Sequence, residues 1–121
     1  MNTKQRVLVV EDDPDTRELV GECLRDRFRV TLAEDGVRAL ALLSHAHQDF
    51  GAIIVDLEMP RLTGTSLIEE LRSRKIRVPV LILSGTPDAR GRAKEVDAEF
   101  MPKPFEVEQL QQKVEQLVEG A

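Results

Sequence analysis

Hydrophobic residues along this chain form two kinds of pattern that follow each other in turn. Short apolar runs are typical of buried strands, and longer segments with apolar residues three or four positions apart are typical of amphipathic helices. The short runs predict strands at Val7–Val10, Phe28–Ala33, Ala52–Asp56, Val78–Ser84 and Glu99–Pro102. The longer segments predict helices at Asp15–Arg27, Val37–Ser44, Ser66–Arg74, Asp88–Val96 and Glu106–Glu119.

The regular exchange of strand and helix determines the expected fold. Right-handed crossovers between successive strands produce a parallel sheet with helices on both faces. Phe28–Ala33 alternates apolar and polar residues, as a half-exposed edge strand does, whereas Val7–Val10 and Val78–Ser84 are apolar almost throughout. We therefore expect an α/β fold of the flavodoxin-like class, with five parallel strands in the order 2-1-3-4-5. Residues 1–121 are expected to form one domain.

Polar residues lie where the predicted strands end. Glu11 and Asp12 follow the first strand, Asp56 ends the third, Ser84 ends the fourth and Lys103 follows the fifth. The carboxyl ends of parallel strands meet at one edge of the sheet, which is where open α/β sheets bind their ligands. We therefore expect these side chains to form one site.

The residue types at this edge suit phosphoryl transfer. A carboxylate such as Asp56 can attack phosphorus and form an acyl phosphate, and the reaction depends mainly on alignment and charge stabilisation. Mg²⁺ is usually held by one or two carboxylates, phosphate oxygens and water, and Glu11 and Asp12 are suited to that role. Lys103 could neutralise one phosphoryl oxygen, and Ser84 could donate a hydrogen bond to another.

Composition and charge exclude several other classes of function. The net charge of −5 and the pI near 5.1 give no electrostatic reason to expect direct nucleic-acid binding. No apolar stretch is long enough to cross a membrane, and the single cysteine cannot form an internal disulfide. These features point to the cytoplasm.

Taken together, the sequence resembles the receiver domain of two-component response regulators over essentially its whole length. The resemblance is carried by four segments in a characteristic order and spacing: Val9–Pro14, Asp56–Pro60 followed by Gly64, Ser84–Gly85 and Phe100–Phe105. It implies a phosphorylation-activated switch, not an enzyme acting on separate substrates. The implied partners are a histidine kinase or phosphotransfer protein, which supplies the phosphoryl group, and an unknown downstream protein.

The resemblance also implies roles for individual residues. Asp56 would be the phosphoacceptor, and Mg²⁺ would be bound by Asp12, Asp56 and the main-chain carbonyl of Glu58, with Glu11 acting through water. Glutamate at position 11 replaces the aspartate that is commonest in the family, and this is a frequent variant. Lys103 would pair with the phosphoryl group, and the peptide bond that follows it is expected to be cis.

Signalling in this family implies a conformational change outside the site. Ser84 would contact the phosphoryl group and move with it, and Phe100 would occupy the position of the switch aromatic residue. The change would alter the face formed by the fourth helix, the fifth strand and the last helix, through which a homodimer could also form. The fourth helix is short and polar, and Gly91 weakens it.

Three other functions compete with this interpretation. An aspartate-nucleophile phosphotransferase for small molecules usually carries a second Asp two residues after the nucleophile, where this chain has Glu58. A nucleotide or flavin binder would need a glycine-rich loop after the first strand, and none is present. A degenerate receiver acting only as an interaction module would not need the complete set of acids, hydroxyl and lysine.

Overall fold

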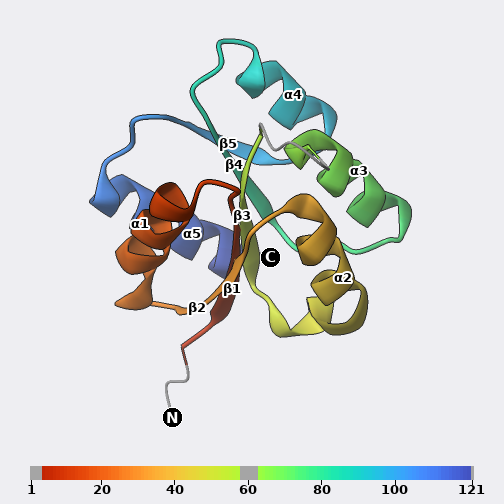
Figure 1. Cartoon of the computed structure of the whole chain (residues 1–121), viewed down its shortest axis with the longest axis horizontal. Coiled ribbons are helices and arrows are strands. Elements are labelled where there is room, and N and C mark those ends of the chain that lie inside the picture. The colour runs from red at the N-terminus through yellow and green to blue at the C-terminus, as the bar shows by residue number, and fades with distance from the viewer. Residues whose placement is uncertain (1–3, 58–62, 121) are drawn as a thin grey trace.

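The computed structural model describes residues 4–57 and 63–120, and Figure 1 shows how their elements are arranged. Within these residues, the strands are β1 (Arg6–Val10), β2 (Arg29–Ala33), β3 (Ala52–Asp56), β4 (Val80–Ser84) and β5 (Glu99–Pro102). The helices are α1 (Pro14–Arg25), α2 (Gly36–Ala46), α3 (Gly64–Ser73), α4 (Ala89–Glu95) and α5 (Val107–Gly120), and the 3-10 helix η1 (His47–Asp49) follows α2.

The strands form one parallel sheet with the order β2-β1-β3-β4-β5, which confirms the predicted fold. β3 and β4 are buried along their whole length, as the continuous apolar runs predicted. β2 is half exposed at the sheet edge. Because all the strands are parallel, their carboxyl ends lie at the same edge of the sheet.

Along each strand, alternate side chains pack into two hydrophobic cores, one on each face of the sheet. On β1, Leu8 and Val10 contribute to the core beneath α2, α3 and α4, whereas Val7 and Val9 contribute to the core beneath α1 and α5. Figure 1 shows α1 and α5 on one side of the strands and α2 and α3 on the other. This alternation fixes the register of each strand, because a slip of one residue would move apolar side chains to the wrong face.

Local hydrogen bonds set where several elements begin. Asp13 caps α1 by accepting a hydrogen bond from the backbone N–H of Thr16, and Pro14 occupies the first helical turn. Phe28 was predicted to start the second strand, but its N–H donates to the carbonyl of Leu24 at the end of α1, so β2 begins one residue later. By contrast, α4 has only seven residues and its N-cap, Asp88, forms no side-chain capping bond.

Two apolar residues at a helical spacing that is typical of core positions are exposed. Leu19 of α1 is 57% exposed and Val107 of α5 is 49% exposed. Both helices are anchored by other residues, among them Val20, Leu24, Leu110 and Val114. Among the described residues, no helix has the length and hydrophobicity needed to cross a bilayer.

Candidate functional site

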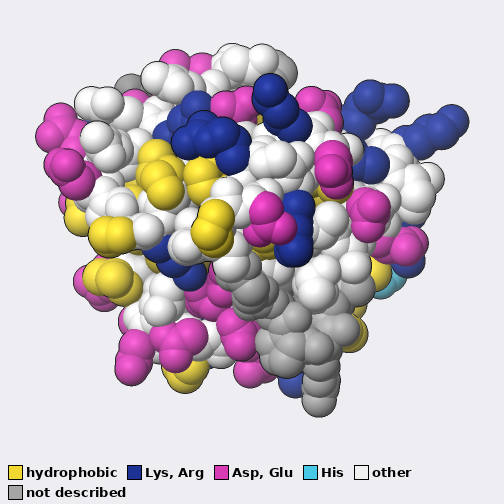
Figure 2. All heavy atoms as spheres, turned by 90° about the horizontal axis from the view of Figure 1, so that it is seen from above, with side chains coloured by type: hydrophobic (Ala, Val, Ile, Leu, Met, Phe, Trp, Pro, Cys, Tyr) yellow, Lys and Arg dark blue, Asp and Glu magenta, His cyan; other side chains and the backbone are white. Residues whose placement is uncertain are grey.

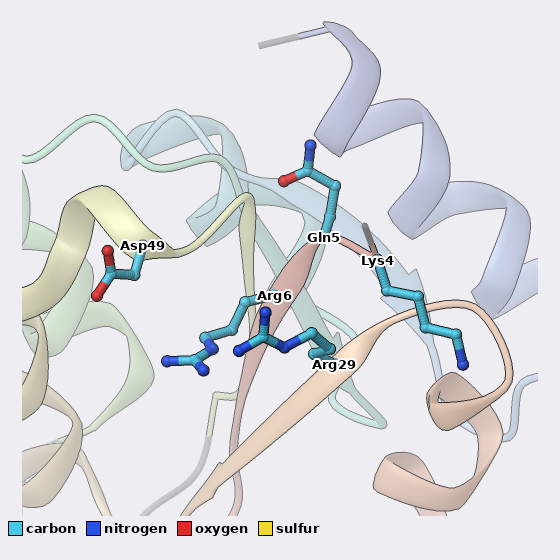
Figure 3. Close-up of a pocket in the computed structure, with 5 residues that line it drawn as sticks. All are labelled: Lys4, Gln5, Arg6, Arg29 and Asp49. Atoms are coloured by element: carbon cyan, nitrogen blue, oxygen red, sulfur yellow. The ribbon is translucent and has the colours of Figure 1, made fainter. Parts of the chain in front are cut away.

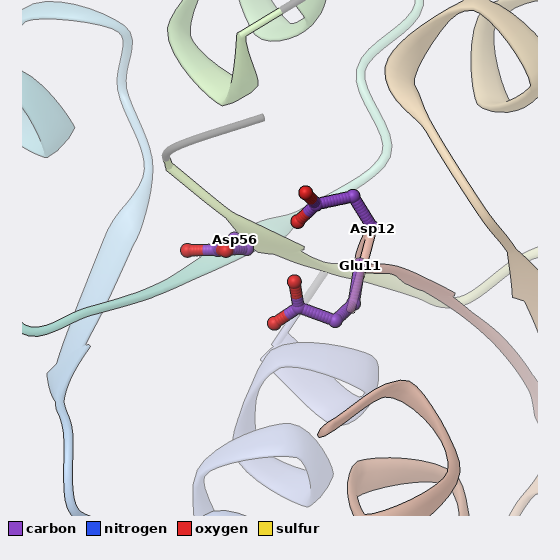
Figure 4. Close-up of side chains that lie close together, drawn as sticks. All are labelled: Glu11, Asp12 and Asp56. Carbon is purple, nitrogen blue, oxygen red and sulfur yellow. The ribbon is translucent and has the colours of Figure 1, made fainter. Parts of the chain in front are cut away.

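Three carboxylates meet at the carboxyl edge of the sheet, as the sequence predicted (Figure 4). Glu11 and Asp12 follow β1, and Asp56 is the last residue of β3, the strand next to β1. One oxygen of each lies within 4.8 Å of the others. Glu11 and Asp56 are buried, whereas Asp12 is exposed at the rim.

This arrangement of oxygens fits a small divalent cation. Mg²⁺ binds oxygen ligands at about 2.1 Å, so ligands on opposite sides of the ion lie about 4 Å apart. Small side-chain rotations would bring the three carboxylates into that range. The main-chain carbonyl of Glu58, which was also expected to bind the ion, lies outside the described residues.

Lys103 brings a positive charge to the buried acids. Its ammonium group is 3.4 Å from Oε1 of Glu11 and 3.5 Å from Oδ1 of Asp56. Its backbone N–H donates to the carbonyl of Ser84, so β4 and the end of β5 hold it in place. The Lys103–Pro104 peptide bond is cis, as expected. Lys103 therefore lies where it could neutralise a group attached to Asp56.

The environment of Glu11 raises its pKa from 4.5 to about 7. Burial is the largest cause, because it disfavours the charged form. Hydrogen bonding with Asp12 and Asp56 and the negative charge of Asp56 raise the pKa further, while a hydrogen bond from the backbone N–H of Asp13 lowers it. The raised pKa of Glu11 therefore indicates that, without a bound cation, the positive charge of Lys103 does not compensate the negative charges of the three carboxylates.

Ser84 is 1% exposed at the end of β4, and its hydroxyl is engaged by a residue that the sequence did not single out. The hydroxyls of Ser84 and Thr86 lie 2.6 Å apart, and the N–H of Thr86 donates to the Ser84 oxygen at 3.1 Å. Thr86 lies two residues after Ser84, in the loop after β4. A second hydroxyl so close to Ser84 in the sequence was the signal that could have identified Thr86.

Two further residues support the site from its border. Arg17 of α1 donates through Nη1 to the carbonyl of Glu11 at 3.0 Å, and thereby fixes the backbone of the acid pair. Gly64, at the start of α3, leaves no room for a side chain: a Cβ there would lie 2.6 Å from the carbonyl oxygen of Asp56. Its N–H donates to the carbonyl of Leu57. The sequence motif included Gly64 but gave no hint of Arg17.

Phe100 lies on β5, which β4 separates from the strand that carries Asp56. It is partly buried against the core beneath α4, and its ring is covered by the guanidinium of Arg90, whose central carbon is 4.9 Å from the ring centroid. Phe100 is paired in register with Ile82 of β4, two residues before Ser84. The ring thus connects β5 to α4, and its predicted role as a switch remains a prediction.

An apolar surface borders Lys103. The exposed Leu19 and Val107 and the partly buried Phe105 line a hollow of about 260 Å³ together with Thr16, Cys23, Lys103 and Pro104. Seen from above the view of Figure 1, hydrophobic side chains gather on one half of the surface among acidic and basic ones (Figure 2). Apolar side chains beside a charged site are typical of a surface that contacts another protein.

Known proteins share this sequence pattern over most of the chain. The family model described as the response regulator receiver domain matches residues 7–115. The response regulator MprA of Mycobacterium sp. (strain KMS) is 38% identical over 109 residues, which are 87% of this chain and 46% of MprA. The sensor histidine kinase TmoS of Ectopseudomonas mendocina is 36% identical over 118 residues, which are 93% of this chain and 12% of TmoS. The chain therefore spans less than half the length of either relative.

Solved structures agree with these matches. The receiver domain of the Francisella response regulator 1452 superposes with a TM-score of 0.89 at 28% identity, covering 97% of this chain and 98% of that domain. The chemotaxis response regulator CheY4 of Vibrio cholerae superposes with a TM-score of 0.84 at 31% identity, covering 95% of this chain and 99% of CheY4. The sheet order, the acidic site and these similarities agree, and the chain belongs to the response regulator receiver domain family of two-component systems.

Proposed function

We propose that this receiver domain is a phosphorylation-activated switch whose Asp56 accepts a phosphoryl group from the phosphohistidine of a histidine kinase or phosphotransfer protein. The observation that carries the proposal is the position of Lys103, whose ammonium lies 3.5 Å from Asp56 within a cluster of three carboxylates. In the transfer, a carboxylate oxygen of Asp56 forms the bond to phosphorus. The phosphorus–nitrogen bond breaks, and the imidazole leaves with the electron pair.

Different groups around Asp56 would each stabilise part of the negative charge on the phosphoryl oxygens. Mg²⁺, bound by Asp12 and Asp56 with Glu11 acting through water, would neutralise phosphoryl oxygens and align the group. Lys103 now contacts Glu11 and Asp56, and it could move its contact to a phosphoryl oxygen without leaving the site. Ser84 could turn its hydroxyl from Thr86 to a phosphoryl oxygen.

The apolar surface next to Lys103 supports a protein as the phosphoryl donor. Leu19, Phe105 and Val107 are close enough to the site for a partner that covers them to present a phosphohistidine to Asp56. The phosphohistidine of a kinase is made from ATP, so we place this encounter in the cytoplasm. Small phosphodonors would react with the same carboxylate but gain nothing from the apolar contacts.

We expect the signal to leave through the face formed by α4, β5 and α5. Ser84 ends β4, and Phe100 lies on the neighbouring β5 beneath Arg90 of α4. A hydroxyl drawn toward a phosphoryl group would vacate space that the ring could fill, so both residues should move together. The seven-residue α4 lacks a side-chain cap, so we expect it to shift readily. A downstream protein or a second copy of this chain would read the altered face.

Phosphorylation can be tested directly with a small phosphodonor. The protein is incubated with acetyl phosphate or phosphoramidate, with and without Mg²⁺, and its mass is measured. We expect one added phosphoryl group in the wild type with Mg²⁺, none in Asp56→Asn, and normal labelling in Asp26→Asn, which removes an exposed carboxylate at the end of α1. Labelling that persists in Asp56→Asn would refute the assignment, and a chain that no donor labels would be an interaction module only.

The conformational part of the proposal needs a separate measurement. Beryllofluoride should mimic the phosphoryl group, and NMR spectra should then shift outside the pocket mainly between Ser84 and Gln112. In Ser84→Ala, we expect phosphorylation to persist while these distant shifts are lost. If shifts in the wild type were confined to the loops around Asp12 and Asp56, this face would not carry the signal.

A further inference from the structure

A second charged hollow lies at the opposite edge of the sheet, where the strands begin. It has a volume of about 390 Å³ and is lined by Lys4, Gln5, Arg6, Arg29 and Asp49. Three of these side chains are cationic and one is anionic, so the hollow is positively charged although the whole chain carries −5. Its volume is within the range of small-molecule sites. None of these residues belongs to the phosphorylation site.

Strand pairing places two arginines next to each other in this hollow. Arg6 and Arg29 are register partners at the start of the parallel strands β1 and β2. Like charges on directly opposed residues of adjacent strands repel and destabilise the pairing. Neither guanidinium forms an ion pair within 4.0 Å with a carboxylate of the described residues. An anion held between them would relieve this repulsion.

The orientation of the side chains favours a shared ligand. In Figure 3 the guanidinium groups of Arg6 and Arg29 extend to the same side, whereas Lys4 and Gln5 point elsewhere. Arg6 is partly buried, and its guanidinium carbon lies 5.9 Å from the ring centroid of the buried Phe50, which limits its motion. Restricting a side chain before binding reduces the entropy that binding costs. Arg6 is thus restrained by Phe50, whereas Arg29 is exposed to solvent.

We propose that Arg6 and Arg29 form an anion-binding site for a small phosphorylated molecule. A phosphoryl group carries up to two negative charges and three acceptor oxygens, and each guanidinium can donate two parallel hydrogen bonds to it. The remaining volume leaves space for the part of the ligand that bears the phosphoryl group. Asp49 lines the same hollow and would accept a hydrogen bond from a hydroxyl or amine of that part. The site is independent of Asp56.

Pyrophosphate is the probe for this site, in buffer freed of divalent cations by a chelating resin. Under these conditions the carboxylates of Glu11, Asp12 and Asp56 repel anions, so binding there is suppressed. In ¹H–¹⁵N NMR titrations we expect shifts at residues 4–6, 29 and 49–51, without shifts at residues 11, 12, 56 and 84–86. Binding should weaken as salt is added, because the contacts are charged and partly exposed.

Substitutions of Arg6 and Arg29 test whether these two residues bind the anion. We expect Arg29→Gln and Arg6→Gln each to weaken pyrophosphate binding by about tenfold, and Arg29→Lys to weaken it less, because charge remains while the paired donors are lost. Arg77→Gln is the matched control, since it removes an exposed arginine from the loop before β4. Arg29 is itself exposed, so Arg29→Gln should fold normally even if Arg6→Gln does not.

Three outcomes would overturn the proposal. The first is the absence of shifts at millimolar pyrophosphate, and the second is equal affinity in wild type and Arg29→Gln. The third concerns an acidic peptide, which would be a different class of ligand. If a short glutamate peptide bound this hollow more tightly than pyrophosphate did, the arginine pair would be a protein contact and not a site for a small phosphorylated molecule.

Discussion

The raised pKa of Glu11 predicts an unusual dependence of stability on pH. An acid whose pKa is higher in the folded state binds its proton more tightly there than in the unfolded chain. Between pH 4.5 and about 7 the native state therefore holds more protons, and the free energy of unfolding falls as pH rises through this range. Below pH 4.5 Glu11 is protonated in both the folded and the unfolded state, so it adds no pH dependence to the free energy of unfolding.

The size of the effect follows from the two pKa values. The difference between 4.5 and about 7 corresponds to about 3 kcal/mol of lost stability once Glu11 is fully ionised. Small domains are stable by only about 5–15 kcal/mol, so a loss of this size is easily measured. Glu11→Gln has no proton to lose in this range. We therefore expect the variant to match the wild type near pH 4.5 and to exceed its stability by up to about 3 kcal/mol above pH 7.

Urea unfolding followed by circular dichroism is the suitable assay, because the chain has neither Trp nor Tyr for fluorescence. The buffers must be free of divalent cations, since a bound cation would replace the proton and hold Glu11 ionised. Glu119→Gln, which removes an exposed carboxylate near the end of α5, is the control. If the wild type lost no more stability than Glu11→Gln as pH rose, or if Glu119→Gln behaved like Glu11→Gln, the reasoning about burial would be refuted.

Three other substitutions test separate parts of the site. Asp12→Ala should abolish most of the thermal stabilisation that Mg²⁺ gives the wild type; an equal shift of melting temperature in both proteins would show that Asp12 is not a ligand. Gly64→Ala should lower the free energy of unfolding by about 2 kcal/mol or more, since its Cβ would lie 2.6 Å from the carbonyl oxygen of Asp56. Chemical denaturation measures this loss, and an unchanged unfolding midpoint would contradict the prediction. Thr86→Val should remove the hydroxyl contact between Thr86 and Ser84 and speed phosphorylation by acetyl phosphate severalfold, as timed by mass spectrometry. An unchanged rate would mean that this 2.6 Å contact does not restrain Ser84.

Sequence patterns were sufficient for the sheet and for the acids at its edge. The apolar runs ending at Asp56 and Ser84 fixed two buried strands, and the alternation in Phe28–Ala33 placed another at the edge. Once the strands are parallel, their carboxyl ends must meet, so Glu11, Asp12 and Asp56 converge whatever the details of packing. Boundaries were less accurate, because they depend on single hydrogen bonds such as that of Phe28 with Leu24.

Contacts between residues distant in the chain were decided only by the tertiary structure. Arg6 and Arg29 become neighbours through strand register, and Arg90 reaches Phe100 only because α4 packs beside β5. Leu19 has the spacing of a core residue but is exposed beside the site. Periodicity along one segment reports which face is apolar, but not how far a neighbouring element extends to cover it. The sequence by itself therefore determined the fold class and which polar side chains gather at one sheet edge. Strand register and helix packing decided which charges pair, which rings are covered and which apolar side chains stay exposed.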